Sequence, residues 1–585
     1  MNDPTVQMTP NSEDTRRRNR VGAALPILIF LYLTVWISTR AHFMADTNVY
    51  TQAILRHQSG TGPIDYRSTT ANPFWDFGHI LWRPLGWLCF VLAKPGTDWL
   101  THQNLRADVL LTLMGINFLA ALLCVVCCFL LARRVARDEW SALFATIGFF
   151  SADAFLNYAH TGNAYVVGLA CLVAGMYLAL PDKTNPVSVA RALAAGVMFA
   201  LAVLFWLPYV FVLPAALAAP LVLDNYEKSR LRLGAYTLGA CAVIGLGAYA
   251  SAIAATGIRN LADLSGWILA SGHGHIQPGG FRAAARLAFA VPRSFVNMDR
   301  DGMWLKRYLV HDPYAPVTIR TLLGLSLWKP LLFYASALAV GMELSGAKAG
   351  RALLMLLAAT VLPIFIFAVF IFEAGSIERY LPLYPFIFLA FGYVLASKRA
   401  KRGSEILLLV TLAAMAVVNV NAMRRGTLDL RRDEAVARIH DLIPLLGPNS
   451  LILAVNEQDN LAEFRQNFPL DPINLDTTWR TYNVLEINTE RLATWREDLA
   501  MRVLSTWQRG GTVWMPMRFL RAQPRPEWNW VEGDDKRVKW TDLPQFFSQF
   551  ESGPVVNGED GFLLLPDSPK NRGILEALDP VTPSQ

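Results

Sequence analysis

The sequence predicts a polytopic α-helical membrane protein of about eleven spans, followed by a C-terminal soluble domain of α/β or α+β type. Two observations carry this fold class. Only 17% of the 585 residues are charged, against about 25% in soluble domains. The apolar residues are gathered in repeated runs of about 20, the length that crosses a bilayer. From residue 424 onward the composition changes to that of a soluble domain.

The N-terminus predicts an uncleaved first span with a cytoplasmic tail. Residues 1–20 end in the arginine cluster RRRNR, directly before the apolar run VGAALPILIFLYLTVWIS. No small-residue cleavage site follows this run, so we do not interpret it as a cleavable signal peptide. Further short basic connections recur between alternate apolar runs, as the positive-inside rule predicts for cytoplasmic loops. These connections account for the net charge of +7 without a nucleic-acid partner.

This alternation predicts a transmembrane domain over residues 21–423 with two long outer loops, at about 41–107 and 256–320. The first loop contains HILWRPLGWLCFVLA, which suits a helix lying in the membrane interface. The run 191–223 is continuously apolar and has Pro208 and Pro214 inside it. The run can therefore be divided into spans in more than one way.

Residues 424–585 are predicted to form a compact domain outside the cytoplasm. ARIHDLIPLLG favours an amphipathic helix, and NSLILAV, GGTVWMPMRF and DGFLLLP favour strands. No Gly-rich phosphate loop, HExxH or GxSxG motif is present. All six cysteines fall in apolar segments before this region and are interpreted as packing residues.

Asp46 is the central candidate for chemistry. It follows the first span within a few residues and is flanked by His42 and Tyr50. A carboxylate at the membrane surface can act as a general base on a hydroxyl, or help to hold a divalent cation. The plainer alternative is a helix N-cap, because TNVYTQAILRH suits the start of a short amphipathic helix. The two roles are compatible.

Ionisable residues on the predicted outer face are further candidates, since burying them at a membrane is costly. Carboxylates with Arg and His on one face suit transfer from a phosphate-linked donor, because Arg or a metal can stabilise the departing phosphate. Arg379 and Arg83 are the candidates for binding the donor phosphate. The candidates for lining the site or contacting an acceptor are His42, Tyr50, His79, Glu373, Glu378, His273 and His275.

Each of these candidates has a simpler alternative. His79 and Arg83 lie four residues apart on the predicted interfacial helix, where lipid headgroup contact serves as well. His273 and His275 flank a glycine and suit a plain loop. Arg379 directly precedes an apolar span and can snorkel to bulk headgroups.

Three segments resemble the GT-C superfamily of polyprenyl-phosphate-sugar-dependent glycosyltransferases, which includes protein O-mannosyltransferases and aminoarabinose transferases. They are MADTNVYTQA after the first span, HILWRPLGW in the outer loop and ERYLPLYPFIFLAFGYVLA late in the membrane part. The resemblance covers about residues 20–421. It implies that Asp46 is the catalytic first-loop acid, as base or metal-site residue, and that Arg379 contacts the lipid phosphate.

Two departures from the family pattern matter. Several families carry adjacent acids in the first loop, whereas here Thr47 follows Asp46. Whether the protein uses a divalent cation therefore stays open, and no other cofactor is expected. The WWDxG-type signature of oligosaccharyltransferases is absent from the C-terminal region, which argues against en bloc transfer to asparagine.

The resemblance predicts an inverting glycosyltransferase of the bacterial inner membrane, hexosyl or pentosyl. It would move a single sugar from a polyprenyl-phosphate donor to a hydroxyl of an extracytoplasmic glycan, lipid or protein. The alternatives are a transporter or flippase of lipid-linked glycans and a membrane-anchored sensor. Transport predicts internal repeats and helices broken at the membrane midplane, and no convincing repeat of spans is visible.

Overall fold

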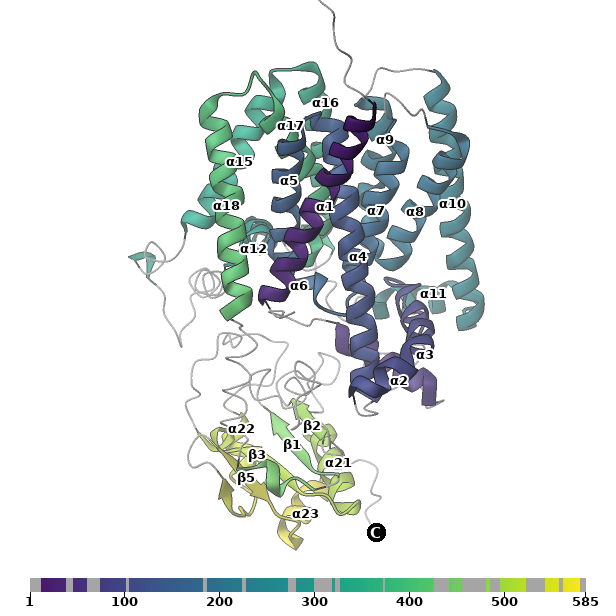
Figure 1. Cartoon of the computed structure of the whole chain (residues 1–585). Helices are drawn as coiled ribbons and strands as arrows, with labels where there is room; N and C mark the ends of the chain where they lie inside the picture. Colours follow the sequence, from purple (N-terminus) through teal and green to yellow (C-terminus); the bar gives the residue numbers. More distant parts are fainter. Residues whose placement is uncertain are drawn as a thin grey trace, which may run out of the picture.

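The described part of the chain is mostly helical, with a small β-sheet near its C-terminal end (Figure 1). The computed structural model describes residues 12–37, 46–59, 74–101, 105–181, 187–223, 228–271, 280–298, 318–320, 327–371, 374–425, 441–447, 449–454, 480–483, 495–521, 542–556 and 561–578.

The helices before the sheet fall into long apolar helices and shorter connecting ones. Their bounds are α1 (Ser12–Ile37), α2 (Thr47–Ser59), α3 (Trp82–Thr101), α4 (Leu105–Ala136), α5 (Glu139–Ser151), α6 (Asp153–Ala159), α7 (Tyr165–Ala179), α8 (Val189–Phe205), η1 (Leu207–Val212), α9 (Leu213–Val222), α10 (Lys228–Thr256), α11 (Leu261–Ser271), α12 (Gly280–Phe295), α15 (Trp328–Ser345), α16 (Lys348–Phe370), η2 (Ile377–Leu383), α17 (Tyr384–Ala396) and α18 (Arg402–Arg425).

Several of these helices have the length and composition of membrane spans. Within the described ranges, five helices qualify, and the α5–α6 pair, bent by 66°, makes up to six. Shorter apolar helices of 10–17 residues add to them. The protein is a multi-pass membrane protein, as predicted. The count of about eleven spans stays a prediction.

α3 begins later than the sequence suggests. Backbone hydrogen bonds from His79 to the Asp76 carbonyl and from Trp82 to the His79 carbonyl form a turn, and α3 starts only at Trp82. Pro84 then falls in the first turn, where its missing N–H costs no helical hydrogen bond. The prediction that His79 and Arg83 share one helix is therefore wrong, because His79 lies in the turn before it.

The apolar run 191–223 is broken at Trp206. α8 ends at Phe205, Trp206 is extended with φ −155° and ψ 111°, and η1 carries Pro208 in its first turn. Pro208 has no N–H to donate to the carbonyl four residues earlier, that of Leu204, and its ring would clash with that carbonyl in a continuous helix, which explains why the helix breaks here. The freed backbone groups are satisfied by the segment before α3: Leu207 N–H donates to Gly78 O, and Leu204 O accepts from Leu81 N–H.

The C-terminal sheet has the strand order β2-β1-β3-β5-β4. β1 pairs parallel with β2 and β3, and β5 pairs antiparallel with β3 and β4. The strand bounds are β1 (Leu451–Ala454), β2 (Arg480–Asn483), β3 (Val513–Pro516), β4 (Val555–Val556) and β5 (Phe562–Leu565). The three segments predicted as strands form β1, β3 and β5.

The sheet has an apolar core of its own. Helices α21 (Trp495–Gln508), α22 (Asp542–Phe547) and α23 (Pro569–Glu576) accompany it, and their buried side chains cluster with those of β1, β3 and β5. Of the predicted helix ARIHDLIPLLG, residues 441–447 form a turn and a short 3-10 helix. Its earlier residues lie outside the described part.

Candidate functional site

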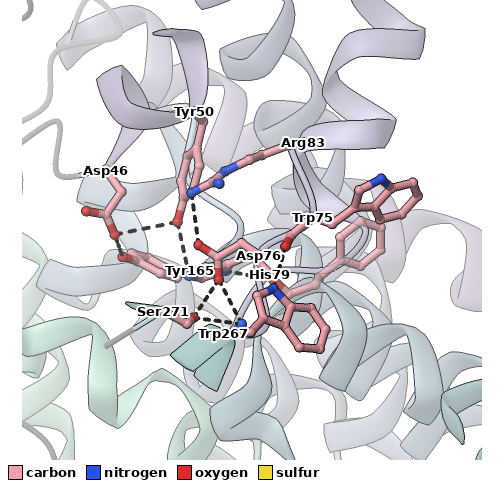
Figure 2. A network of polar contacts seen from close by, with 11 residues as sticks. Asp46, Tyr50, Trp75, Asp76, His79, Arg83, Tyr165, Trp267 and Ser271 are labelled. Atoms are coloured by element: carbon pink, nitrogen blue, oxygen red, sulfur yellow. Dashed lines mark hydrogen bonds and ion pairs between the residues drawn. The ribbon is translucent and has the colours of Figure 1, made fainter. Parts of the chain in front are cut away.

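Asp46 stands at the start of α2, where its backbone carbonyl accepts from Tyr50 N–H. Its Oδ2 accepts a hydrogen bond of 2.8 Å from the Tyr165 hydroxyl, and the Tyr50 hydroxyl lies 3.5 Å from the same oxygen (Figure 2). No described residue donates to Oδ1. One carboxylate oxygen is thus fixed by protein and the other is left open.

Tyr50 links Asp46 to His79. The Tyr50 hydroxyl lies 3.1 Å from His79 Nε2, and His79 Nδ1 lies 3.0 Å from the Phe205 carbonyl. A carbonyl only accepts, so Nδ1 carries the hydrogen and Nε2 of a neutral ring accepts. Burial lowers the pKa of His79 below its ordinary value, against the opposing pull of nearby carboxylates.

Asp76 anchors the turn that carries His79. Its Oδ2 lies 2.9 Å from Nη2 of Arg83, and its Oδ1 accepts from Gly78 N–H at 2.8 Å and from the Ser271 hydroxyl at 2.5 Å. Figure 2 shows Arg83 reaching past Tyr50 to this carboxylate, with the guanidinium carbon 5.5 Å from the Tyr50 ring centre. Arg83 is therefore held inside the protein by an ion pair.

The same turn is tied to the helices behind it. Trp267 Nε1 donates to the Trp75 carbonyl at 2.7 Å, and the Tyr249 hydroxyl donates to the Phe77 carbonyl at 3.1 Å. Because the turn's carbonyls accept from α10 and α11, the position of His79 is set by elements far away in the sequence.

Tyr165 connects Asp46 to Glu378 and Arg379. Its ring centre lies 4.9 Å from that of Tyr158 and 4.7 Å from that of Trp206. The Tyr158 hydroxyl donates to Glu378 Oε2 at 2.9 Å.

The two ionisable residues of η2 adjoin this aromatic cluster. Arg379 Nε lies 3.9 Å from Glu378 Oε1, and its guanidinium carbon lies 5.7 Å from the Trp206 ring centre. The ring cluster is therefore bordered by the Asp46 carboxylate, which Tyr165 contacts, and by the Glu378–Arg379 pair.

The turn between α6 and α7 holds the start of α2 in place. Gly162 N–H donates to Thr47 Oγ1, and Trp82 Nε1 donates to the Gly162 carbonyl, both at 3.1 Å. Asn117 of α4 donates to the carbonyls of Thr161 and Asn163 at 2.6 Å each. These bonds fix Asp46 relative to Tyr165.

The structure brings together six of the residues singled out in the sequence: Asp46, Tyr50, His79, Arg83, Glu378 and Arg379. Four others lie outside the described part of the chain: His42, Glu373, His273 and His275. The partners that sequence reasoning missed are Tyr158, Tyr165 and Ser271. The two tyrosines occur in SADAFLNYAHTGNAY, a predicted outer turn, which was the available signal.

A metal site is a separate question. Among the described residues, no group of three or more His, Cys, Asp or Glu side chains is placed to hold a metal ion.

Solved structures similar to this chain include three transferases. ArnT from Cupriavidus metallidurans bound to undecaprenyl phosphate is 13% identical over 88% of this chain and 97% of that one, with a TM-score of 0.48. The Archaeoglobus fulgidus oligosaccharyltransferase in complex with zinc and sulfate is 12% identical over 93% and 72%, with a TM-score of 0.46. Arabinofuranosyltransferase AftD from mycobacteria is 13% identical over 92% and 37%, with a TM-score of 0.43.

These structures share 12–13% identity with the chain at TM-scores below 0.5, so the resemblance to the GT-C superfamily stays a prediction. No family model and no curated protein matches the chain.

Proposed function

We propose that this protein is an inverting glycosyltransferase of the GT-C type. It moves a single sugar from a polyprenyl-phosphate donor to a hydroxyl of an acceptor outside the cytoplasm. The observation that carries the proposal is the state of Asp46: Tyr165 fixes one carboxylate oxygen, and the other accepts from no described residue. The Tyr165 ring packs on Trp206, which lies next to the guanidinium of Arg379. A guanidinium is the group suited to a departing phosphate.

The proposed reaction is a single displacement. The acceptor oxygen attacks the anomeric carbon on the face opposite the phosphate and gives its proton to Oδ1 of Asp46. The bond between the anomeric carbon and the phosphate oxygen breaks, and its electron pair leaves with the polyprenyl phosphate. Configuration at the anomeric carbon is inverted. Asp46 is the general base.

Arg379 is assigned to the donor phosphate. A guanidinium offers forked donors to phosphate oxygens and balances their growing charge as the bond breaks. Arg83 was also a candidate in the sequence, but its closer and more deeply buried ion pair with Asp76 and its place against Tyr50 suit a positioning role. Glu378 orients Tyr158, and through it the ring of Tyr165.

The proposal includes location and orientation. The tail 1–20 lies in the cytoplasm of a bacterium, the transmembrane domain 21–423 in its inner membrane, and the region 424–585 outside. Figure 1 draws α2, α3 and the C-terminal sheet at one end of the helices, opposite the N-terminal end of α1. This agrees with a site that faces an extracytoplasmic acceptor.

The test is transfer in proteoliposomes, with a panel of polyprenyl-phosphate sugars and a crude extracytoplasmic acceptor fraction. Release of polyprenyl phosphate is compared for the intact protein, Asp46→Asn and Asp263→Asn. Asp263 is a matched control, a carboxylate in the first turn of α11. We expect Asp46→Asn to lose about 10²–10⁴-fold in turnover and Asp263→Asn to keep it.

Turnover that survives in a folded Asp46→Asn protein would remove Asp46 from the chemistry. Movement of the lipid-linked sugar across the bilayer without release of polyprenyl phosphate would overturn the enzyme in favour of the transporter alternative.

A further inference from the structure

The Tyr50 hydroxyl lies between two acceptors and has one hydrogen to donate. His79 Nε2 is 3.1 Å away, and Asp46 Oδ2 is 3.5 Å away. Tyr50 is 1% exposed and His79 is 8% exposed, so this choice is made largely away from bulk water. Whether the His79 ring is neutral or protonated decides which acceptor takes the Tyr50 hydrogen.

With a neutral His79 ring, the hydrogen goes to the imidazole. Nδ1 donates to the Phe205 carbonyl, which leaves a lone pair on Nε2 facing Tyr50. The shorter of the two distances is the one to Nε2. Asp46 then accepts only from Tyr165 among the described residues.

With a protonated His79 ring, the direction reverses. Nε2–H donates to the Tyr50 oxygen, and the hydroxyl hydrogen is left with Asp46 as its nearest acceptor. A second hydrogen bond stabilises the Asp46 carboxylate and makes it a weaker base.

Charged and polar groups surround His79 from each element packed on it. Asp46 lies at the start of α2, Asp76 in the turn and Arg83 on α3, and the Tyr165 ring of α7 lies 6.1 Å away. The two carboxylates favour the charged ring, whereas Arg83 and, above all, burial oppose it, so the pKa of His79 is lowered. The neutral ring is the resting state near neutral pH.

We infer that His79, acting through Tyr50, controls whether Asp46 serves as the base. His79 and Tyr50 are positioning residues in this scheme, because neither touches the reacting atoms. The inference rests on the proposed transfer reaction. It adds a way in which acid slows that reaction, through protonation of His79.

Three variants separate this control from simple support of the fold. His79→Asn keeps an N–H near the Nδ1 position for the Phe205 carbonyl but removes Nε2. Tyr50→Phe removes the hydroxyl and keeps the ring beneath Arg83. The double variant combines them. Tyr334→Phe is the control, since its hydroxyl bonds the Ala288 carbonyl away from the site.

We expect His79→Asn to lower kcat by about 3- to 10-fold, because Tyr50 then donates to Asp46, with the donor KM unchanged. Adding Tyr50→Phe should restore kcat, since no hydroxyl is left to donate. Tyr50→Phe alone should lose the part of the acid-side decline of kcat that His79 causes in the intact protein. Tyr334→Phe should match the intact protein throughout.

If the losses of kcat in His79→Asn and Tyr50→Phe add up in the double variant, the inference is overturned and the two residues have a structural role only. A second readout does not depend on transfer: ¹⁵N NMR of histidine in nanodiscs, with the His79 signal assigned by its absence from His79→Asn. A neutral ring with hydrogen on Nδ1 is expected, and hydrogen on Nε2 would overturn the inference. If that signal is as expected and no donor is turned over, the proposed function fails instead.

Discussion

The guanidinium of Arg83 lies 2.9 Å from the carboxylate of Asp76, with the two side chains 4% and 5% exposed. Breaking a buried ion pair by removing one partner costs about 3–5 kcal/mol, because it leaves the other charge buried without compensation. This pair joins the turn before α3 to the helix itself, and the Arg83 guanidinium carbon lies 5.5 Å from the Tyr50 ring centre. Stability and the geometry of the candidate site therefore depend on the same contact.

Replacing Arg83 by Gln should lower the apparent melting temperature in detergent, because Asp76 keeps its charge without its main partner. The double variant Arg83→Gln with Asp76→Asn should melt closer to the intact protein than Arg83→Gln does. Lys94→Gln is the control, since the side chains of its pair with Asp98 on α3 are 39% and 29% exposed and pairs in contact with solvent contribute little. A melting temperature unchanged in Arg83→Gln would contradict the assignment.

Gly162→Ala should destabilise the contact between the α6–α7 turn and α2. A Cβ at this position would lie 2.7 Å from Leu113 Cβ and 2.8 Å from Thr47 Cγ2, closer than side chains pack. We expect a lower melting temperature and lower turnover. Gly115→Ala on α4 is the matched control, because its Cβ meets nothing within 4 Å and alanine favours helix by about 0.5–1 kcal/mol. Equal effects of the two changes would refute the packing argument.

Arg379→Lys should weaken donor binding although it keeps the positive charge. Lysine lacks the planar fork that binds phosphate and stacks on Trp206. We expect the donor KM to rise about 10-fold, with kcat lowered because the leaving phosphate is less well stabilised. Arg286→Lys, an exposed arginine on α12, should change neither constant. A donor KM that stays the same in Arg379→Lys would move the phosphate site elsewhere.

Acid should destabilise the protein through His79. Burial lowers the pKa of His79 in the folded state below its ordinary value of 6.5. The unfolded chain therefore takes up this proton first as pH falls. The contribution of neutral His79 to the free energy of unfolding is fully present above pH 6.5. It is lost as the pH falls from there toward the folded-state pKa.

The measurement is the melting temperature at pH values from about 7 to 5. His79→Asn should show a shallower decline on the acid side than the intact protein. His57→Gln, at an exposed position of α2, should leave the decline unchanged. Identical slopes in the intact protein and His79→Asn would show that this histidine does not titrate as described.

The long apolar helices were predictable because a bilayer demands runs of about 20 apolar residues with few charges. Asp46 was predictable as a candidate for a related reason: a charge next to a span is costly and needs a use. The partners of Asp46 were not predictable. Tyr165 lies 119 residues away, and tyrosines near span ends usually serve as interfacial anchors. Only the α5–α6 bend and the turn at Gly162 bring it to the carboxylate.

The role of Arg83 was hidden for a different reason. Its partner Asp76 is seven residues earlier, which is not a spacing that pairs side chains on one helix face. The pair forms because Asp76 lies in a turn and Arg83 in the first helical turn after it. Where α3 begins was the missing fact, and the sequence placed that start too early.

The break at Trp206 also bears on the order in which the chain is inserted. Outside the aqueous phase, a backbone group left unpaired costs several kcal/mol, and the break frees Leu207 N–H and Leu204 O. Residues 78–81, which pair with both, are synthesised more than a hundred residues before α8. The ribosome therefore synthesises both hydrogen-bond partners, Gly78 O and Leu81 N–H, before the interrupted helix. A circular permutant that placed 74–101 after α18 would reverse this order. The break at Trp206 would then enter the membrane with Leu207 N–H and Leu204 O unpaired.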